Sequence, residues 1–462
     1  MTAPTPQDLV EHALKTSASD SCIIIVRDST SANLRWANNT LTTNGVMHRV
    51  MATVIAFVGA GQGTASGSVT GNAASLDQVT SVVEAADAAA RDSTPAEDAA
   101  ELVTGGVCVN WADMPGETSI DVFAAFAPAL GDAFGHASDA GRILYGFVDH
   151  DVTTTYLGSS AGLRLRHVQP TGHYGCTGKT DDLTGSAWVG GATLDFGDVD
   201  AHAMDAELAQ RLSWAERKVD QPAGRYDTVL PPTAVADLMI YAYWSAGARE
   251  AHEGQSVFSK PGGGTRIGET LSPHPVQMFS DPTYDRLQAA PFVTATASNN
   301  ETSVFDNGLA LSRTDWVSDG RLAALLQTRH SAAMTGHRVT PGIDNLVLSV
   351  DGAQGSLDDM VGDVERGLLL TCLWYIRVVD PQTLLLTGLT RDGVYLVENG
   401  EVTGAVNNFR FNESPVDLLS RFSSASETVP SFSREWGDHF SRTATPALRV
   451  PDFNMSSVSK AN

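Results

Sequence analysis

The chain has 462 residues, of which 42% are apolar and 18% are charged, enough to build the cores of two to three domains. Its 30 Lys and Arg against 54 Asp and Glu give a formal net charge of −24, and this acidic excess argues against binding to nucleic acid or to an anionic membrane surface. No apolar run is as long as the roughly 20 residues that span a bilayer, the first 21 residues lack the pattern of a secretory signal, and the four cysteines are scattered, so we expect a cytoplasmic protein with reduced thiols.

The first half of the sequence predicts helices packed against an antiparallel sheet. Apolar residues recur at helical spacing in residues 9–14, 79–86, 123–134 and 204–215, and Pro128 indicates a kink or a later start of the third of these helices. The apolar and alternating runs predict strands at residues 22–26, 47–58, 143–148, 152–157, 162–167 and 187–192. The Gly- and Ser-rich residues 59–71 predict a loop. Together these elements are typical of an α+β domain.

The character of the sequence changes near residue 220, which divides the chain into an N-terminal domain, 1–220, and a C-terminal domain, 221–462. The second domain opens with a predicted helix that runs from Pro232 to about residue 251. A capping box formed by Ser356 and Asp359 predicts one further helix over residues 357–370. Residues 384–389, 393–398 and 405–411 alternate like strands, so we expect a β-rich barrel-like or sandwich domain with few helices.

Two groups of residues contain side chains of the types that bind metals. A helical metallopeptidase site needs two His one turn apart beside a Glu, and the one His-Glu pair, His252-Glu253, has no second His in range; it is better explained as a helix end before Gly254. His167, His173 and Cys176 include the residue types that bind zinc. The Pro and two Gly that separate them favour a hairpin turn instead.

Several segments resemble the TldD/PmbA family, in which two related subunits form a peptidase complex. The first of them, Arg35–Gly45, is similar to the signature strand near the N-terminus of that family. The resemblance continues, in the family's order, through Gly254–Phe258, Arg266–Glu269, Val304–Gly308, Thr335–Arg338, Pro341–Leu346, Gly355–Met360 and Glu365–Leu368. It extends over roughly residues 8–450, with Asn307 where the family has an acidic residue.

The departures from the family indicate which of the two subunits this chain resembles. The TldD-type subunit carries an HExxxH helix and a Cys near its C-terminus as zinc ligands. Here the corresponding helix reads Tyr241–Ala246, without His or carboxylate, and Arg434–His439 stands where the Cys would fall. The chain therefore resembles the TldE (PmbA) type, which implies no cofactor in this chain, zinc in a TldD-type partner, and a role as the non-catalytic subunit.

The resemblance also implies a cleft for an extended peptide, enclosed by the two subunits. We expect two segments to line this cleft: Arg35, Trp36, Asn38 and Asn39, and Gln255, Ser256, Phe258 and Arg266. The aromatic side chains of Tyr241, Tyr243 and Trp244 would suit a partner interface, or equally an ordinary core. The alternative to a subunit of a heterodimer is a stand-alone peptide-binding or assembly protein that kept the fold without peptidase activity.

Overall fold

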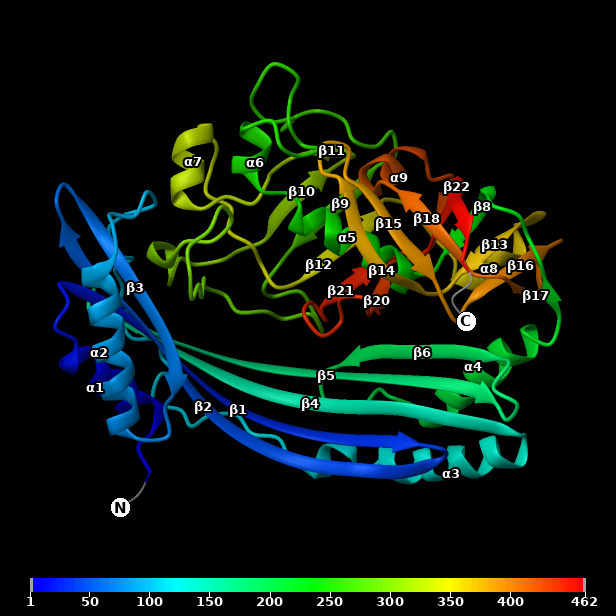
Figure 1. Cartoon of the computed structure of the whole chain (residues 1–462), viewed down its shortest axis with the longest axis horizontal. Helices are drawn as coiled ribbons and strands as arrows, with labels where there is room; N and C mark the ends of the chain where they lie inside the picture. The colour runs from blue at the N-terminus through cyan, green and yellow to red at the C-terminus, as the bar shows by residue number, and fades with distance from the viewer. Residues whose placement is uncertain (1–2, 460–462) are drawn as a thin grey trace.

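The computed structural model describes residues 3–459. Its N-terminal part is built on one long antiparallel sheet in the order β3-β2-β1-β4-β5-β6. The strands of this sheet are β1 Ser21–Ala37, β2 Thr40–Ala60, β3 Gly63–Asn72, β4 Arg142–Ser159, β5 Arg164–Thr180 and β6 Ser186–Thr193. Several of them are 17 residues or longer, and Figure 1 shows the sheet extending beneath the whole C-terminal part of the chain.

Three predictions for this region are wrong. The residues expected to form a loop, 59–71, complete β2 and form most of β3. The two strands predicted between residues 143 and 157 are one strand, β4. The hairpin turn predicted around His167, His173 and Cys176 is the middle of β5, which runs unbroken past its Pro and Gly residues.

Helices cover one face of the sheet, and the C-terminal part covers the other. The helices are α1 Pro6–Thr16, α2 Leu76–Asp92, α3 Phe126–Asp139 and α4 Ala201–Trp214, with the short 3-10 helix η1 Ile120–Phe123 before α3. Ile24 and Trp36 on β1 pack under these helices, whereas Ile23 and Ile25 pack against Phe292 and Phe305 of the C-terminal part. This alternation follows from the period of two in a strand. Pro128 lies in the first turn of α3, so the later start of that helix is confirmed.

Two further sheets form the C-terminal part. One has the order β11-β10-β9-β12-β21-β20, and the other has the order β14-β15-β18-β22-β8-β13-β16-β17-β7, with β19 paired to β22. The first contains β9 Val276–Ser280, β10 Thr314–Ser318, β11 Arg321–Leu322, β12 Leu346–Val350, β20 Val429–Ser431 and β21 Thr443–Thr445. The second contains β7 Lys218–Val219, β8 Gly224–Leu230, β13 Arg366–Leu370, β14 Leu373–Asp380, β15 Leu385–Thr390, β16 Val394–Glu398, β17 Glu401–Val406, β18 Phe409–Glu413, β19 Ser424–Ala425 and β22 Leu448–Val458.

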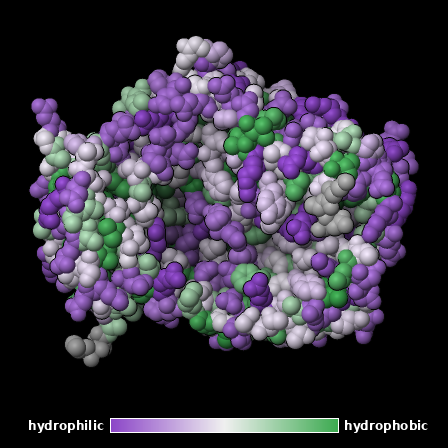
Figure 2. Space-filling model, in the orientation of Figure 1, coloured by the Kyte–Doolittle hydropathy of each residue, from purple (hydrophilic) through white to green (hydrophobic). Residues whose placement is uncertain are grey.

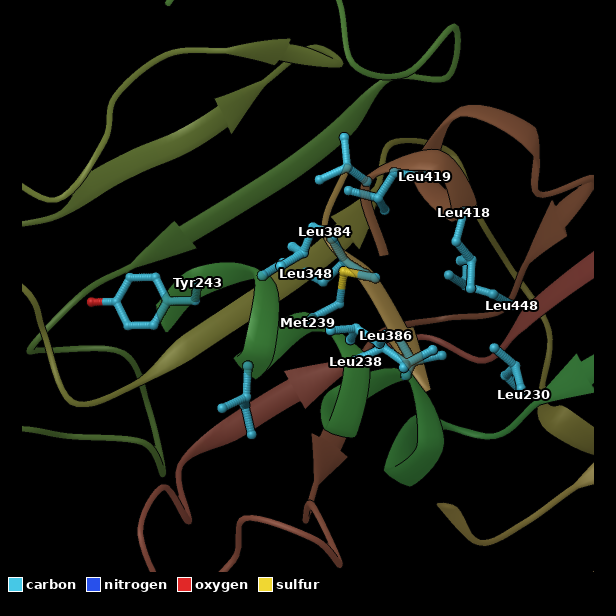
Figure 3. Packing of buried hydrophobic residues seen from close by; sticks show 14 of the residues in the cluster. Leu230, Leu238, Met239, Tyr243, Leu348, Leu384, Leu386, Leu418, Leu419 and Leu448 are labelled. Carbon is cyan, nitrogen blue, oxygen red and sulfur yellow. The ribbon is translucent and has the colours of Figure 1, made fainter. Parts of the chain in front are cut away.

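The helix α5, Pro232–Trp244, lies within the core of this C-terminal part (Figure 3). Leu238 and Met239 of α5 pack with Leu348 of β12 and Leu386 of β15, and all four are buried. Apolar side chains therefore surround α5 on nearly every side, which is typical of a central core helix. The shorter helices are α6 Ala248–His252, α7 Arg329–Thr335, α8 Leu357–Gly362, α9 Pro415–Arg421 and the 3-10 helix η2 Val304–Asp306.

The predicted helices of the C-terminal part are too long. The helix expected to reach residue 251 ends at Trp244 and is followed by the separate helix α6. The capping box of Ser356 and Asp359 is present, but α8 ends at Gly362, and the apolar residues after it form β13. The α+β class and the β-rich C-terminal part with few helices are confirmed, and no sheet closes into a barrel within residues 3–459.

Candidate functional site

A cleft separates the long sheet from the C-terminal part of the chain, and Figure 2 shows the hollow from the side drawn in Figure 1. Two adjoining cavities in it, of about 470 and 480 Å³, share three wall residues: Tyr174, Trp188 and Phe432. Tyr174 and Trp188 belong to β5 and β6, whereas Phe432 follows β20. Residues far apart in the sequence therefore form one continuous recess.

The outer edge of β6 forms much of the wall that the long sheet contributes to this recess. Within the described chain β6 pairs with β5 alone, and its residues 188–193 line the first cavity together with residues 429–432 of the opposite wall. Gly190 and Gly191 fit beneath neighbouring rings, because a Cβ on Gly190 would lie 2.3 Å from the ring of Trp188 and a Cβ on Gly191 would lie 2.6 Å from the Tyr174 hydroxyl. The Trp188 carbonyl accepts a hydrogen bond from Arg211, but no strand of the described chain pairs with the outer edge of β6, which can therefore accept an extended chain.

A polar cluster occupies the floor of the second cavity. His173 of β5 forms an ion pair with Asp149 of β4, with Nδ1 and Oδ1 2.7 Å apart, and its Nε2 lies 3.7 Å from Asp438 across the cleft. Desolvation lowers the pKa of His173, but Asp149, Asp438 and Asp151 outweigh it and raise the pKa above the ordinary value. Burial, together with the neighbouring Asp149 carboxylate, raises the pKa of Asp151 to about 6.

A second charged contact joins the walls of the cleft near the same point. The guanidinium of Arg434 lies 5.0 Å from the ring of Trp188 on β6 and 4.8 Å from the ring of Trp374 on β14. It also lies 3.5 Å from Asp392. A cation between two indole faces is held by both rings, so Arg434 ties the C-terminal part to the sheet.

The first predicted cleft segment reaches the recess only in part. Arg35 is exposed and lines the second cavity. Trp36 also borders this cavity, but its side chain is 2% exposed and packs against Phe126 and Phe134 on the helix side of the sheet. Asn38 and Asn39 form the β1–β2 turn, both with positive φ. Their side-chain amide groups form hydrogen bonds with residues 142, 144 and 145 of β4, so both residues stabilise the hairpin.

The second predicted cleft segment lies on the C-terminal part and lines neither cavity of the recess. Gln255 is exposed, while Ser256 and Phe258 are buried. Arg266 donates from Nε to Glu269 at 3.0 Å and from Nη1 to the carbonyl of Val257 at 2.9 Å, which fastens this loop to itself. The structure therefore does not bring this segment together with Arg35 in the recess, and its part in substrate binding stays a prediction.

The aromatic residues at the end of α5 pack within the chain. The hydroxyl of Tyr243 donates to the carbonyl of Ile343 and accepts from its N–H, and Tyr243 is 3% exposed. The half-buried rings of Tyr241 and Trp244 lie edge-on to Trp436, with centroids 5.6 and 5.4 Å away. A contact of these residues with a partner stays a prediction.

The residues considered as zinc ligands do not converge. His173 faces the cleft, whereas Cys176, an odd number of residues later on the same strand, is buried on the helix side of the sheet. Burial raises the pKa of the Cys176 thiol to about 12, so the thiolate that a metal needs is disfavoured. Within residues 3–459 no three His, Cys, Asp or Glu side chains are placed to hold a metal ion.

Helix α5 carries one buried carboxyl group, which contacts residues 433–435. Asp237 is 1% exposed; its Oδ1 accepts from the Ser433 hydroxyl at 2.5 Å and from the Glu435 N–H at 3.0 Å. Its Oδ2 has no hydrogen-bond partner among the described residues. Burial raises the pKa of Asp237 to about 7. The nearby thiol of Cys372 is buried, which raises its pKa to about 12, and within residues 3–459 Asp237 belongs to no group of three side chains that could hold a metal ion, so its surroundings do not fit a zinc site.

Sequence reasoning missed most of the residues that form the recess. Trp188, Phe432 and Arg434 carry no local motif, and only the fold brings them together. The alternation along β5 could have placed His173 on the cleft face, had the Pro and Gly residues of that segment not indicated a turn. No helix in the described range is both long and apolar enough to cross a membrane.

Several solved structures share the architecture of this chain. The chain resembles TldE from Thermococcus kodakarensis, with a TM-score of 0.77 and 16% identity over 97% of this chain and 99% of that one. It also resembles two proteins described as modulators of DNA gyrase, each with a TM-score of 0.76 and 15% identity. The one from Thermotoga maritima matches over 97% of this chain and 100% of its own, and the one from Bacteroides thetaiotaomicron over 98% of both. At these identities the likeness shows a shared fold.

No curated protein matches the chain in sequence. The model of the PmbA/TldA metallopeptidase C-terminal domain, however, matches residues 223–457, which is more than half of the chain. The chain belongs to the TldD/PmbA family.

Proposed function

We propose that the chain is a TldE-like, non-catalytic subunit of a cytoplasmic TldD/TldE-type zinc metallopeptidase, and that it binds unfolded or small peptides in the cleft. In this proposal a TldD-type partner supplies the zinc and the catalytic base. Family membership and the fold shared with the Thermococcus TldE support the proposal.

The observation that carries the proposal is the free edge of β6 along a cavity of about 470 Å³. An extended peptide can add to such an edge as a further strand, because its backbone N–H and C=O groups pair with those of β6. Backbone pairing demands little of the peptide sequence. Trp188 and Phe432, both in the walls, offer apolar contacts for side chains of the bound peptide.

The residues of this chain suit binding better than hydrolysis. Tyr241–Ala246, which corresponds to the ligand helix of the TldD type, holds neither imidazole nor carboxylate. The carboxyl group that α5 does carry, Asp237, is buried and held by Ser433 and Glu435. In this proposal the zinc of the TldD-type partner polarises the peptide carbonyl.

The alternative is a stand-alone peptide-binding or assembly protein with the same cleft and no peptidase partner. One observation favours it: Tyr241, Tyr243 and Trp244 pack inside this chain, so that surface gives no argument for a partner. Both proposals place the peptide in the same cleft. They differ in whether peptide cleavage appears when a TldD-type subunit is added.

Peptide binding to the purified chain tests the cleft. We expect a labelled unstructured peptide to bind in fluorescence anisotropy, and Trp188→Ala to weaken its affinity about tenfold, because a cleft-lining aromatic anchor is lost. Trp111→Ala is the control, since Trp111 packs against Tyr156 on the helix side of the sheet. Equal affinity of both variants and the unchanged chain would show that the peptide does not lie along β6.

A further inference from the structure

The long sheet has a second open edge, on the side away from the cleft. β1 pairs with β2 along nearly its whole length, but β3 pairs only with Met51–Ala60 of β2. Thr40–Val50 therefore have a strand on one side only, as far as residues 3–459 show. In Figure 1 this half of β2 forms the outer margin of the sheet. We call residues 40–50 the β2 edge.

The β2 edge lacks most of the features that keep other edges from pairing. Edge strands are commonly blunted by charged side chains, Pro or bulges. The β2 edge has neither Pro nor an acidic residue, and its one register shift, at Thr42, lies near its beginning. Its apolar side chains are exposed: Leu41 by 47%, Val46 by 58% and Met47 by 56%.

The edge of β14 shows the contrast. Its pairing with β15 is interrupted by two register shifts, and Glu435 accepts hydrogen bonds from the N–H groups of Tyr375 and Ile376 at 3.1 and 3.0 Å. Arg377 and Asp380 add charge to the same strand. β14 also exposes apolar side chains, at Val378 and Val379, but its backbone is already occupied or distorted. Both edges thus expose apolar side chains. They differ in the backbone, which is free to pair in the β2 edge and is occupied or distorted in β14.

Charge indicates which occupant the β2 edge can accept. The chain carries a net charge of −24, so two copies repel each other over most of their surface. Residues 29–76, however, contain no Asp or Glu, and Arg35, His48 and Arg49 lie within them. A second copy of this acidic chain therefore meets the least repulsion at the β2 edge.

We propose that two copies of this chain associate by antiparallel pairing of their β2 edges about a two-fold axis near Gly45. Identical strands related by such an axis are antiparallel, so each edge is its own complement. In this register Leu41 faces Arg49 and Thr43 faces Met47 of the other copy, and no like charges are opposed. The two long sheets become one continuous sheet. The cleft lies on the other border of the sheet, so this inference does not depend on the proposed function.

Sedimentation velocity of the full chain over a range of concentrations tests the inference. A single paired strand buries less than the about 800 Å² per partner of a typical stable complex, so we expect a reversible dimer of micromolar affinity. The double variant Val46→Glu/Met47→Glu should weaken dimerisation at least about tenfold, because it places like charges across the axis. The control, Val378→Glu/Val379→Glu, adds the same charge at the β14 edge and should leave the dimer unchanged.

Hydrogen exchange of the unchanged chain gives a second readout that needs no variant. Amide exchange in residues 40–50 should slow as the concentration rises, while exchange at the β14 edge should not. The inference is overturned by a chain that stays monomeric at high micromolar concentration, by a dimer that survives the change at Val46 and Met47, or by equal loss in the β14 control.

Discussion

The imidazole of His173 stacks on the ring of Phe432, with centroids 5.6 Å apart and planes inclined by 18°. His173 belongs to the long sheet and Phe432 to the C-terminal part, so this pair bridges the cleft at the point where its two cavities meet. Asp149 lies beside the same imidazole at 2.7 Å. The contact thus combines an ion pair from one wall with a ring from the other.

His173 should stabilise the chain at neutral and lower pH, and less at alkaline pH. Its pKa is raised in the folded chain, so the stabilisation is fully present below the ordinary value of 6.5 and is lost as pH rises through the folded pKa. We expect His173→Gln to lower the free energy of unfolding by about 1 kcal/mol at about pH 7, and by less at about pH 9. Urea unfolding at the two pH values measures this difference.

Phe432→Leu serves as the control for His173, because it removes the ring but leaves the charges in place. It should lower the free energy of unfolding by a similar amount at both pH values. A pH-independent loss in His173→Gln would show that the imidazole acts by packing alone.

Asp237 should make the chain less stable as pH rises. Burial raises its pKa from the ordinary 3.8 to about 7, so the stability present below about pH 4 is lost as pH rises through 7. Asp237→Asn removes this ionisation. We expect the free energy of unfolding of Asp237→Asn, minus that of the unchanged chain, to increase by a few kcal/mol from about pH 5 to about pH 8. Chemical unfolding at both pH values measures this difference.

Ser433→Ala provides the opposite test at the same site. The Ser433 hydroxyl donates to Asp237 and lowers its pKa, so removing it should steepen the loss of stability with pH. Parallel pH profiles for the unchanged chain and both variants would contradict the assignment of this slope to Asp237.

Asn39 should contribute more to stability than its neighbour in the same turn. Its side chain accepts from the Leu144 N–H at 2.6 Å and donates to the Arg142 carbonyl at 2.8 Å, whereas Asn38 accepts only from the exposed Tyr145 hydroxyl. We expect Asn39→Ala to destabilise the chain by about 2–3 kcal/mol and Asn38→Ala by about 1 kcal/mol. Both residues have positive φ, so the backbone cost is matched.

Asn39→Gly separates the two contributions, because Gly adopts positive φ without cost. Asn39→Gly should still lack the hydrogen bonds of the Asn39 amide. It should, however, be about 1 kcal/mol more stable than Asn39→Ala, because the backbone strain is relieved. Equal thermal unfolding temperatures for the Asn38 and Asn39 variants would show that the amide contacts to β4 do not hold the hairpin.

The sequence predicted the class of the fold because many of its elements follow strong local rules. The alternation and β-branched residues of 22–26 and 47–58 lie within strands, and Ser356 with Asp359 begins a helix. The error at β5 has a physical reason. Pro170 lies where β5 pairs with β4 but not yet with β6, whose first partner is Gly172, so a missing N–H there leaves the ladder to β6 intact.

The cleft was less predictable than the fold. Its walls come from β5, β6 and the segment after β20, and no local spacing links Trp188 to Phe432 or Arg434. Resemblance of motifs pointed instead to residues 35–39 and to the loop around Ser256, of which only residues 35–37 border the recess. Local patterns identify elements, whereas a recess between the long sheet and the C-terminal part of the chain depends on how those elements are placed.

The most direct test of the proposed function is a zinc determination and a peptidase assay on the purified chain, alone and after mixing with a TldD-type subunit. We predict no stoichiometric zinc and no peptide cleavage by the chain alone. Cleavage should appear in the mixture, exceed that of the TldD-type subunit alone, and disappear on chelation of zinc. One equivalent of zinc and peptide cleavage in the lone chain would contradict the proposal.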